Sequence, residues 1–326
     1  MESAPVRPVD RPWLNLTLLV LTVGTAAFTF DVSFGEAMAS LDARVADALA
    51  FSATLVAILG AHEMGHYVLA RLHGVDTSLP YFIPVPFLGP GTMGAVIRIR
   101  DRIPTRNALV DIGAAGPLAG LVVAVPLIAW GLSSAQLVDA PPVQAAFPGE
   151  LSLWRLGQEL VGWLDVQVLG APPPPEPAVA RYSTMLFADS PLMKGLQWLV
   201  LGPLPEGKEV ALNPMVMAGW FGLLVTLLNL IPVGQLDGGH LTFALWGPRA
   251  RLVGKAMALG LLYLIVFHTV SWTVWLGVVS LAVGFGHPEV TRPQEPLGTG
   301  RKLICALCFL ALAACAMPVP IRMVTW

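Results

Sequence analysis

Long apolar stretches, each close to the length of a membrane-crossing helix, constrain this chain more than any other feature. A helix needs ~20 residues to cross the ~30 Å hydrocarbon core of a bilayer. Charged residues make up 12% of the chain and apolar residues 55%, whereas a typical soluble domain has about 25% charged residues. Lipid, rather than water, is therefore expected to solvate most of the surface. The seven candidate spans are Trp13–Phe30, Ala46–Leu72, Ala108–Leu132, Ala211–Ile231, Leu252–Phe267, Trp272–Phe285 and Leu303–Met317.

These stretches predict an all-α polytopic membrane protein with about six to seven transmembrane helices. Alternation of apolar residues with Arg98 and Arg100 over residues 94–100 adds a strand, and hence a small membrane-associated β-hairpin between the second and third helices. The sixth span is the weakest, because it is short and ends in Gly284-Phe285-Gly286. The expected surroundings are the lipid bilayer.

Lysine and arginine predict the orientation, because cytoplasmic loops carry an excess of both. If seven spans alternate, every basic cluster outside the longest loop falls on one side, which we assign to the cytoplasm. The net charge of −2 shows no nucleic-acid footprint, so no nucleic-acid partner is expected. The resulting divisions are a cytoplasmic tail (1–12), a first membrane half (13–132), an extracytoplasmic Pro-rich loop (133–210) and a second membrane half (211–326).

The long loop has one segment of note, Leu151–Leu164, which has the pattern of an amphipathic interfacial helix. A plain tethering loop is the alternative interpretation of the whole 133–210 region.

The second span contains His62-Glu63-Met64-Gly65-His66. Residues i and i+4 share one face of a helix, so the two imidazoles can bind the same zinc ion. Glu63 lies beside them as a potential general base. Histidine and glutamate are costly at membrane depth and usually functional there. This favours a zinc site over separate hydrogen bonds to neighbouring helices.

Catalytic zinc takes three protein ligands and leaves one position open, so a third ligand must come from elsewhere. Asp237 is the candidate, because Pro232 and the nearby glycines end the fourth span in a turn that lets an acidic side chain face inward. His240 is the rival ligand, and a supporting or structural role is preferred for it. Both motifs lie near the cytoplasmic ends of their spans, so the active site is expected near the cytoplasmic side.

Three motifs resemble the site-2 protease family of intramembrane zinc metalloproteases. They are the His62–His66 motif, the stretch Asn229–Gly239, which fits the family pattern Asn-x-x-Pro-x-x-x-Leu-Asp-Gly, and Gly116-Pro117-Leu118-Ala119-Gly120. The resemblance is closest over about residues 46–132 and 211–247. Residues 80–84 and 94–100 are similar to the branch that includes the chloroplast members.

The resemblance implies a zinc metalloendopeptidase with His62, His66 and Asp237 as metal ligands and Glu63 as the catalytic glutamate. Asn229 matches the asparagine that the family places near the substrate. The implied reaction is hydrolysis in or near transmembrane segments of membrane-protein substrates, such as single-span transcriptional regulators or anti-sigma factors, within regulated intramembrane proteolysis.

Several alternatives remain open on the sequence. Asn229 can donate to substrate or to the developing oxyanion, or it can make an interhelical hydrogen bond. The strand over residues 94–100 can hold an extended substrate by strand addition, or it can belong to a plain surface hairpin. A zinc or ion transporter that uses the same ligands is the chief rival function, although it has no need of Glu63 as a base. An inactive zinc-binding scaffold is a further alternative.

Overall fold

The structure, a computed structural model, describes residues 11–35, 39–140, 152–170, 172, 183–211, 213–288 and 290–325. The chain divides into two units. The first comprises Met1–Ala135, Leu212–Thr226 and Glu289–Cys308, and the second comprises Gln136–Ala211, Leu227–Pro288 and Phe309–Trp326.

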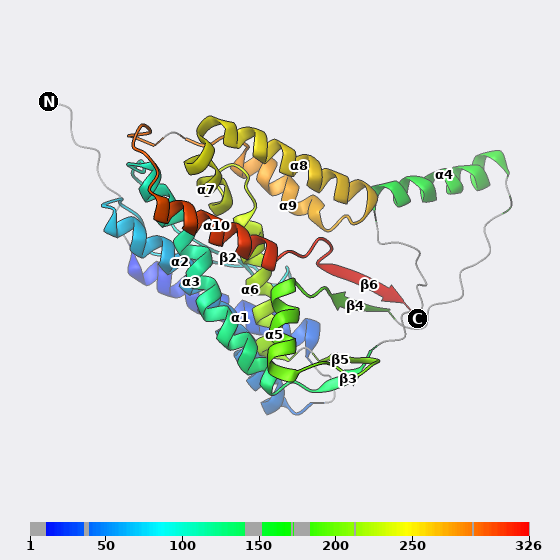
Figure 1. Cartoon of the computed structure of the whole chain (residues 1–326). Coiled ribbons are helices and arrows are strands. Elements are labelled where there is room, and N and C mark those ends of the chain that lie inside the picture. The colour runs from blue at the N-terminus through cyan, green and yellow to red at the C-terminus, as the bar shows by residue number, and fades with distance from the viewer. Residues whose placement is uncertain are drawn as a thin grey trace. The chain divides into compact units, whose positions relative to one another are not determined.

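Three long helices that pack side by side form the frame of the first unit (Figure 1). Two of them begin at a capping side chain: Ser40 Oγ accepts the N–H of Ala43, and Thr105 Oγ1 accepts the N–H of Ala108. These bonds satisfy donors that the start of a helix leaves unpaired. The helices are α1 (Pro12–Phe34), α2 (Leu41–Leu72) and α3 (Arg106–Ser133).

Phe51 of α2 is a centre of packing in this unit and is fully buried. Its ring stacks on that of Phe30 with centroids 4.7 Å apart, and the ring of Phe221 meets it edge-on at 6.1 Å. Phe221 belongs to α6 (Pro214–Leu230), so the first part of that helix joins α1 and α2 around one aromatic cluster. Aromatic burial of this kind stabilises a core beyond the area removed from solvent.

A two-stranded antiparallel hairpin lies between α2 and α3 and consists of β1 (Tyr81–Pro84) and β2 (Thr92–Val96). The side-chain amide of Asn15, on α1, donates to the carbonyl oxygens of Leu79 and Pro80 at 3.2 and 2.8 Å. Because Asn15 is buried, these bonds tie the entry of the hairpin to α1.

The strand expected over residues 94–100 is shorter in the structure, where β2 ends at Val96. Beyond that point the N–H of Arg98 donates to the hydroxyl of Ser78 at 2.9 Å. A side-chain oxygen there takes the place of a main-chain acceptor. Backbone pairing then resumes, with the N–H of Ser78 donating to the carbonyl of Arg98 at 3.1 Å and the N–H of Arg100 donating to the carbonyl of Asp76 at 2.9 Å.

An ion-pair cluster joins three helices of the first unit at one end of α3. Arg301, in the first turn of α10 (Thr299–Ala314), makes a bidentate pair with Asp111, with Nε–Oδ1 at 2.9 Å and Nη2–Oδ2 at 2.7 Å. His73 Nε2, at the C-terminal end of α2, lies 2.9 Å from the same carboxylate. Asp111 therefore links α2, α3 and the start of α10 next to Ile112.

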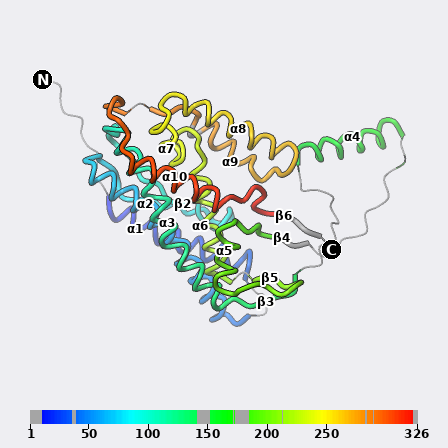
Figure 2. The backbone as a smooth tube through the Cα atoms, viewed as in Figure 1, coloured from blue at the N-terminus to red at the C-terminus, as the bar shows by residue number. Residues whose placement is uncertain are grey.

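The second unit contains several helices and two small sheets (Figure 2). Strands β3 and β5 pair antiparallel, and so do β4 and β6, which joins the second unit's early and late segments. Its elements are β3 (Leu137–Asp139), α4 (Leu153–Leu169), β4 (Ser183–Phe187), α5 (Pro191–Leu201), β5 (Lys208–Val210), α7 (Asp237–Trp246), the 3-10 turn Gly247–Arg249, α8 (Ala250–Phe267), α9 (Trp272–Val278), the π-helical turn Val279–Val283 and β6 (Ile321–Thr325).

The loop predicted over 133–210 is thus partly ordered as helices and strands. The helix expected over Leu151–Leu164 appears as α4, although Leu151 itself and residues 173–175 of the proline run lie outside the described residues.

Four helical stretches among the described residues are long and apolar enough to cross a membrane: Pro12–Phe34, Leu41–Leu72, Arg106–Ser133 and Asp237–Phe267. The first three agree with the first three expected spans, and the last contains the fifth. The expected fourth, sixth and seventh spans fall on shorter helices. Pro232 follows closely on α6, which ends after 17 residues, or about 25 Å at ~1.5 Å per residue. The chain is a mostly helical protein of membrane type, and the number of its crossings stays a prediction.

Candidate metal centre

Helix α2 presents two buried imidazoles on one face. His62 and His66 are 3% and 7% exposed, and their Nε2 atoms lie 3.1 Å apart. Two nitrogens bound to one zinc at ~2.0–2.1 Å with tetrahedral angles lie about 3.3 Å apart. The pair therefore fits two corners of a tetrahedral zinc site, as the i, i+4 spacing predicts.

A main-chain carbonyl of α3 fixes the protonation of one ligand. His66 Nδ1 lies 2.7 Å from the carbonyl oxygen of Ile112. Because a carbonyl can only accept, Nδ1 carries the proton and donates it. The lone pair of the neutral ring is then on Nε2, the atom that faces His62. A bond of this kind orients a metal-binding histidine and makes it more basic.

Two glycines allow α2 and α3 to approach closely enough for that bond. A Cβ at Gly116 would collide with the His66 imidazole, and a Cβ at Gly65 would collide with the carbonyl oxygen of Ala115. Gly116 opens the Gly-Pro-Leu-Ala-Gly motif, whose function sequence patterns alone left unexplained. The structure gives it a physical role: the absence of a side chain leaves the space that His66 fills.

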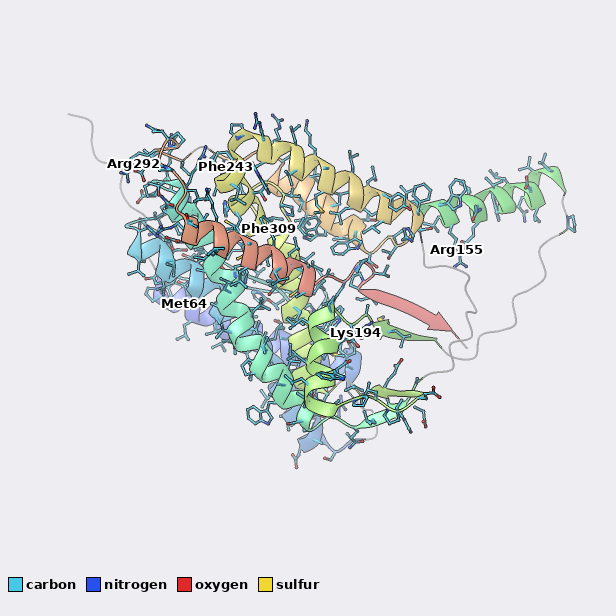
Figure 3. The ribbon with its side chains drawn as sticks, viewed as in Figure 1. Met64, Arg155, Lys194, Phe243, Arg292 and Phe309 are labelled. Carbon is cyan, nitrogen blue, oxygen red and sulfur yellow. The ribbon has the colours of Figure 1, made fainter. Side chains whose placement is uncertain are left out.

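Glu63 lies beside the paired imidazoles and is buried, with 8% of the residue exposed. Its Oε1 atom is 4.0 Å from His62 Nε2. A carboxylate at this distance can exchange a proton with a water molecule between them. The neighbouring Met64, labelled in Figure 3, is 40% exposed instead. Adjacent helix positions thus separate a buried acid from a surface side chain.

In the second unit, glycines shape the turn that leads to Asp237, the first residue of α7. Gly234 has φ +55°, in the left-handed region that favours glycine. A Cβ at Gly238 would collide with the carbonyl oxygen of Leu230, and one at Gly239 with that of Gly234. The start of α7 therefore packs directly on the backbone that ends α6. A carboxylate in the first turn of a helix is also favoured by the helix dipole.

The predicted site residues form two groups. His62, Glu63 and His66 converge in the first unit. Asn229, in the last turn of α6, and Asp237, the first residue of α7, belong to the second unit. The six residues 231–236 connect the two helices. That the two groups meet at one metal stays a prediction.

His240, the rival ligand, has a partner that the sequence did not suggest. Its Nδ1 lies 2.6 Å from Nε2 of His287, and Nδ1 of His287 lies 2.6 Å from the carbonyl oxygen of Pro288. The His287 ring also stacks on that of Phe243, labelled in Figure 3, with centroids 4.3 Å apart. Burial lowers the pKa of His287, which favours the neutral ring. Nδ1 of His287 then donates to the carbonyl, and Nδ1 of His240 donates to His287.

The supporting groups escaped sequence analysis for identifiable reasons. The Ile112 carbonyl carries no side-chain signal, because every residue has one. His287 lies 47 residues from His240, and no spacing rule joins the two.

Comparisons with known proteins identify the family of this chain. The profile of Peptidase family M50 matches residues 50–272. The chain is 32% identical over 244 residues to the probable zinc metalloprotease EGY2, chloroplastic, of Oryza sativa subsp. indica. This match covers 73% of this chain and 37% of the relative. It is 28% identical over 272 residues to the probable zinc metalloprotease EGY1, chloroplastic, of Arabidopsis thaliana, covering 83% and 43%.

The chain therefore belongs to Peptidase family M50, the site-2 proteases, a family of intramembrane zinc metalloproteases. It spans less than half the length of the two curated relatives just described. No solved structure matches it.

The close approach of α3 to His66 leads to a prediction. Gly116→Ala should weaken zinc binding by roughly tenfold or more, the usual effect of disturbing a group that orients a metal ligand, because the new methyl group displaces the imidazole. Elemental analysis after equilibration with a buffered chelator measures the effect. Gly24→Ala is the control, since a Cβ there meets nothing within 4 Å. Equal zinc affinity in both variants would contradict the assigned role of Gly116.

Proposed function

We propose that this chain is a zinc-dependent endopeptidase that hydrolyses peptide bonds in or near transmembrane segments of other membrane proteins. The observation that carries the proposal is the His62–His66 pair, with Nε2 atoms 3.1 Å apart and Glu63 beside them, on a helix long and apolar enough to span a bilayer. Polar groups of this kind are costly at membrane depth, so those found there usually serve a function.

Asp237 is the proposed third ligand. Two imidazoles, one carboxylate and an open position are a donor set of catalytic zinc, and these three residues are a group that suits a metal ion. Zinc supplies Lewis acidity here: it polarises a carbonyl and makes water nucleophilic near neutral pH.

The chain's own residues divide the remaining work. His66 stays oriented by the Ile112 carbonyl. Glu63 takes the proton of the attacking water and passes it to the leaving amine. The amide of Asn229 donates to the substrate backbone or the developing oxyanion. Each role follows from the chemistry of the side chain.

Strand β2 is the proposed dock for an extended substrate segment. A helix hides its peptide bonds in its own hydrogen bonds, so a substrate must unwind before it is cut. On the other strand, the entry of β1 is tied to α1 through Asn15, whereas β2 has the exposed side chains Met93 and Val96, at 57% and 50%. Strand addition to the free edge of β2 would hold the substrate extended.

The proposed partners are membrane-protein substrates, and the family resemblance suggests single-span transcriptional regulators or anti-sigma factors within regulated intramembrane proteolysis. The proposed location is a multi-pass membrane protein with its active site near the cytoplasmic side.

Glu63→Gln separates catalysis from metal binding. The amide keeps the shape of the side chain but cannot accept a proton, so cleavage of a model membrane substrate should fall by at least about 100-fold, in line with the contribution of a general base. Zinc content should be unchanged. Met64→Leu, one position along the same helix, is the control and should cleave normally. Cleavage by Glu63→Gln at the wild-type rate would refute the protease mechanism and favour a zinc transporter.

Asp237→Asn tests the third ligand. Replacing an anionic ligand by a neutral amide should lower zinc retention and activity together, and elemental analysis with a cleavage assay measures both. Asp139→Asn, an exposed carboxylate on β3, is the matched control. Full zinc and full activity in Asp237→Asn would leave the protease proposal standing but would move the search for the ligand to His240.

Cysteine-accessibility labelling tests the topology. Cysteines at positions 98 and 249 should react with a membrane-impermeant reagent only from the cytoplasm, and one at position 158 only from the opposite side, because Lys and Arg mark the cytoplasmic face. Reaction of position 158 from the cytoplasm would overturn the orientation and the proposed depth of the active site.

A further inference from the structure

Helix α4 (Leu153–Leu169) has an apolar face that is mostly exposed. None of its residues is buried, and Trp154 and Trp163 are each 58% exposed. At 3.6 residues per turn, most of the large apolar side chains fall on one half of the helix, and Val166 and Leu169 fall on the other. The exposed members of this face are Leu153, Trp154, Leu156, Leu160, Val161, Trp163, Leu164 and Val168.

The opposite face of α4 is polar but carries little net charge. Arg155, labelled in Figure 3, pairs with Glu159 at 3.0 Å, and Asp165 is the remaining charged residue of the helix. Gln158 and Gly162 also lie on this face, together with the apolar Val166 and Leu169. The helix is therefore suited to burial of its apolar face rather than to electrostatic binding of anionic groups.

The position of α4 in the second unit indicates what covers that face. The ring of Trp154, near the start of α4, lies against that of Phe267 with centroids 6.3 Å apart. Phe267 is the last residue of Asp237–Phe267, one of the stretches long and apolar enough to cross a membrane. Figure 1 shows the start of α4 at this end of α8. The end of a membrane-crossing helix lies at the boundary between hydrocarbon and headgroups.

Tryptophan suits that boundary, because its ring is apolar and its N–H remains near water. An apolar face that carries two tryptophans, backed by a polar face, is the pattern of a helix that lies in the plane of the membrane surface. We propose that α4 is an interfacial helix, with its apolar face in the lipid bilayer beside the end of α8 and its polar face toward water.

This assignment adds a lipid-binding surface to the protein and is independent of the protease reaction. It places residues 152–170 at the membrane surface, so the segment between α3 and α6 is anchored rather than freely tethered. The apolar face lies in the headgroup–acyl boundary of the bilayer, since a helix beside the end of a membrane span meets lipid first.

Spin labels on the full-length protein in phosphatidylcholine vesicles test the proposal. Cysteines replace Leu160 and Leu164 on the apolar face, and Gln158 and Gly162 on the polar face as matched controls. The wild type, whose three cysteines are buried, gives the background. The ratio of collisions with oxygen, which dissolves in lipid, to collisions with a water-soluble nickel complex should be several-fold higher at 160 and 164 than at 158 and 162.

Three results would overturn the proposal. Equal exposure of all four positions to the nickel complex would mean that α4 extends into water. Shielding of 160 and 164 from both reagents would mean that protein, such as a second copy or another chain, covers the face. A preference for oxygen that appears only in vesicles with anionic lipid would also contradict it, because the polar face is nearly neutral.

A charge substitution gives a second measurement. Leu160→Glu should reduce the oxygen preference of a label at position 164 several-fold, because a carboxylate resists burial in lipid. Gln158→Glu adds the same charge on the polar face and should leave the label unchanged. Since zinc content and cleavage are not measured here, failure of this test and failure of the proposed protease function remain distinguishable.

Discussion

The close approach of α2 and α3 is the constraint on which the candidate metal centre depends. Gly65 and Gly116 remove the side chains that would hold the two helices apart. At that separation the Ile112 carbonyl reaches Nδ1 of His66 at 2.7 Å and turns its Nε2 lone pair toward His62. A metal-binding pair at membrane depth needs such support, because a buried imidazole without a partner is costly and poorly oriented.

Glycines also permit close backbone contact in the second unit. Gly238 and Gly239 let the first turn of α7 pack on the backbone that ends α6, and Asp237 stands at that turn with its carboxylate favoured by the helix dipole. Both motifs that mark the family therefore combine a chemical group with glycines that permit backbone contact. The spacing of the ligands and the placing of the glycines are two parts of one requirement, since a ligand is useful only where the backbone can bring it.

The long apolar helices set the conditions for this chemistry. They exclude water from most of the surface, so polar groups within them persist where they are bonded, as Asp111 is to Arg301 and His73. A protease in such surroundings must also keep its substrate extended, and strand addition to β2 is the proposed means. Helix α4 extends the same logic to the membrane surface, where an exposed apolar face with two tryptophans finds lipid.

Sequence alone determined the membrane class, the three long helices, the His62–Glu63–His66 motif and the presence of an amphipathic segment near α4, because periodicity and i, i+4 spacing are local properties. The lengths of the elements needed the structure: α6 ends after 17 residues, and the strand over residues 94–100 is interrupted after Val96, where the N–H of Arg98 donates to the hydroxyl of Ser78. Tertiary structure also decided the Ile112–His66 bond, the room that Gly116 leaves, and the pairing of His240 with His287. These depend on contacts between residues distant in the chain, and backbone carbonyls and absent side chains leave no spacing signal for sequence analysis to detect.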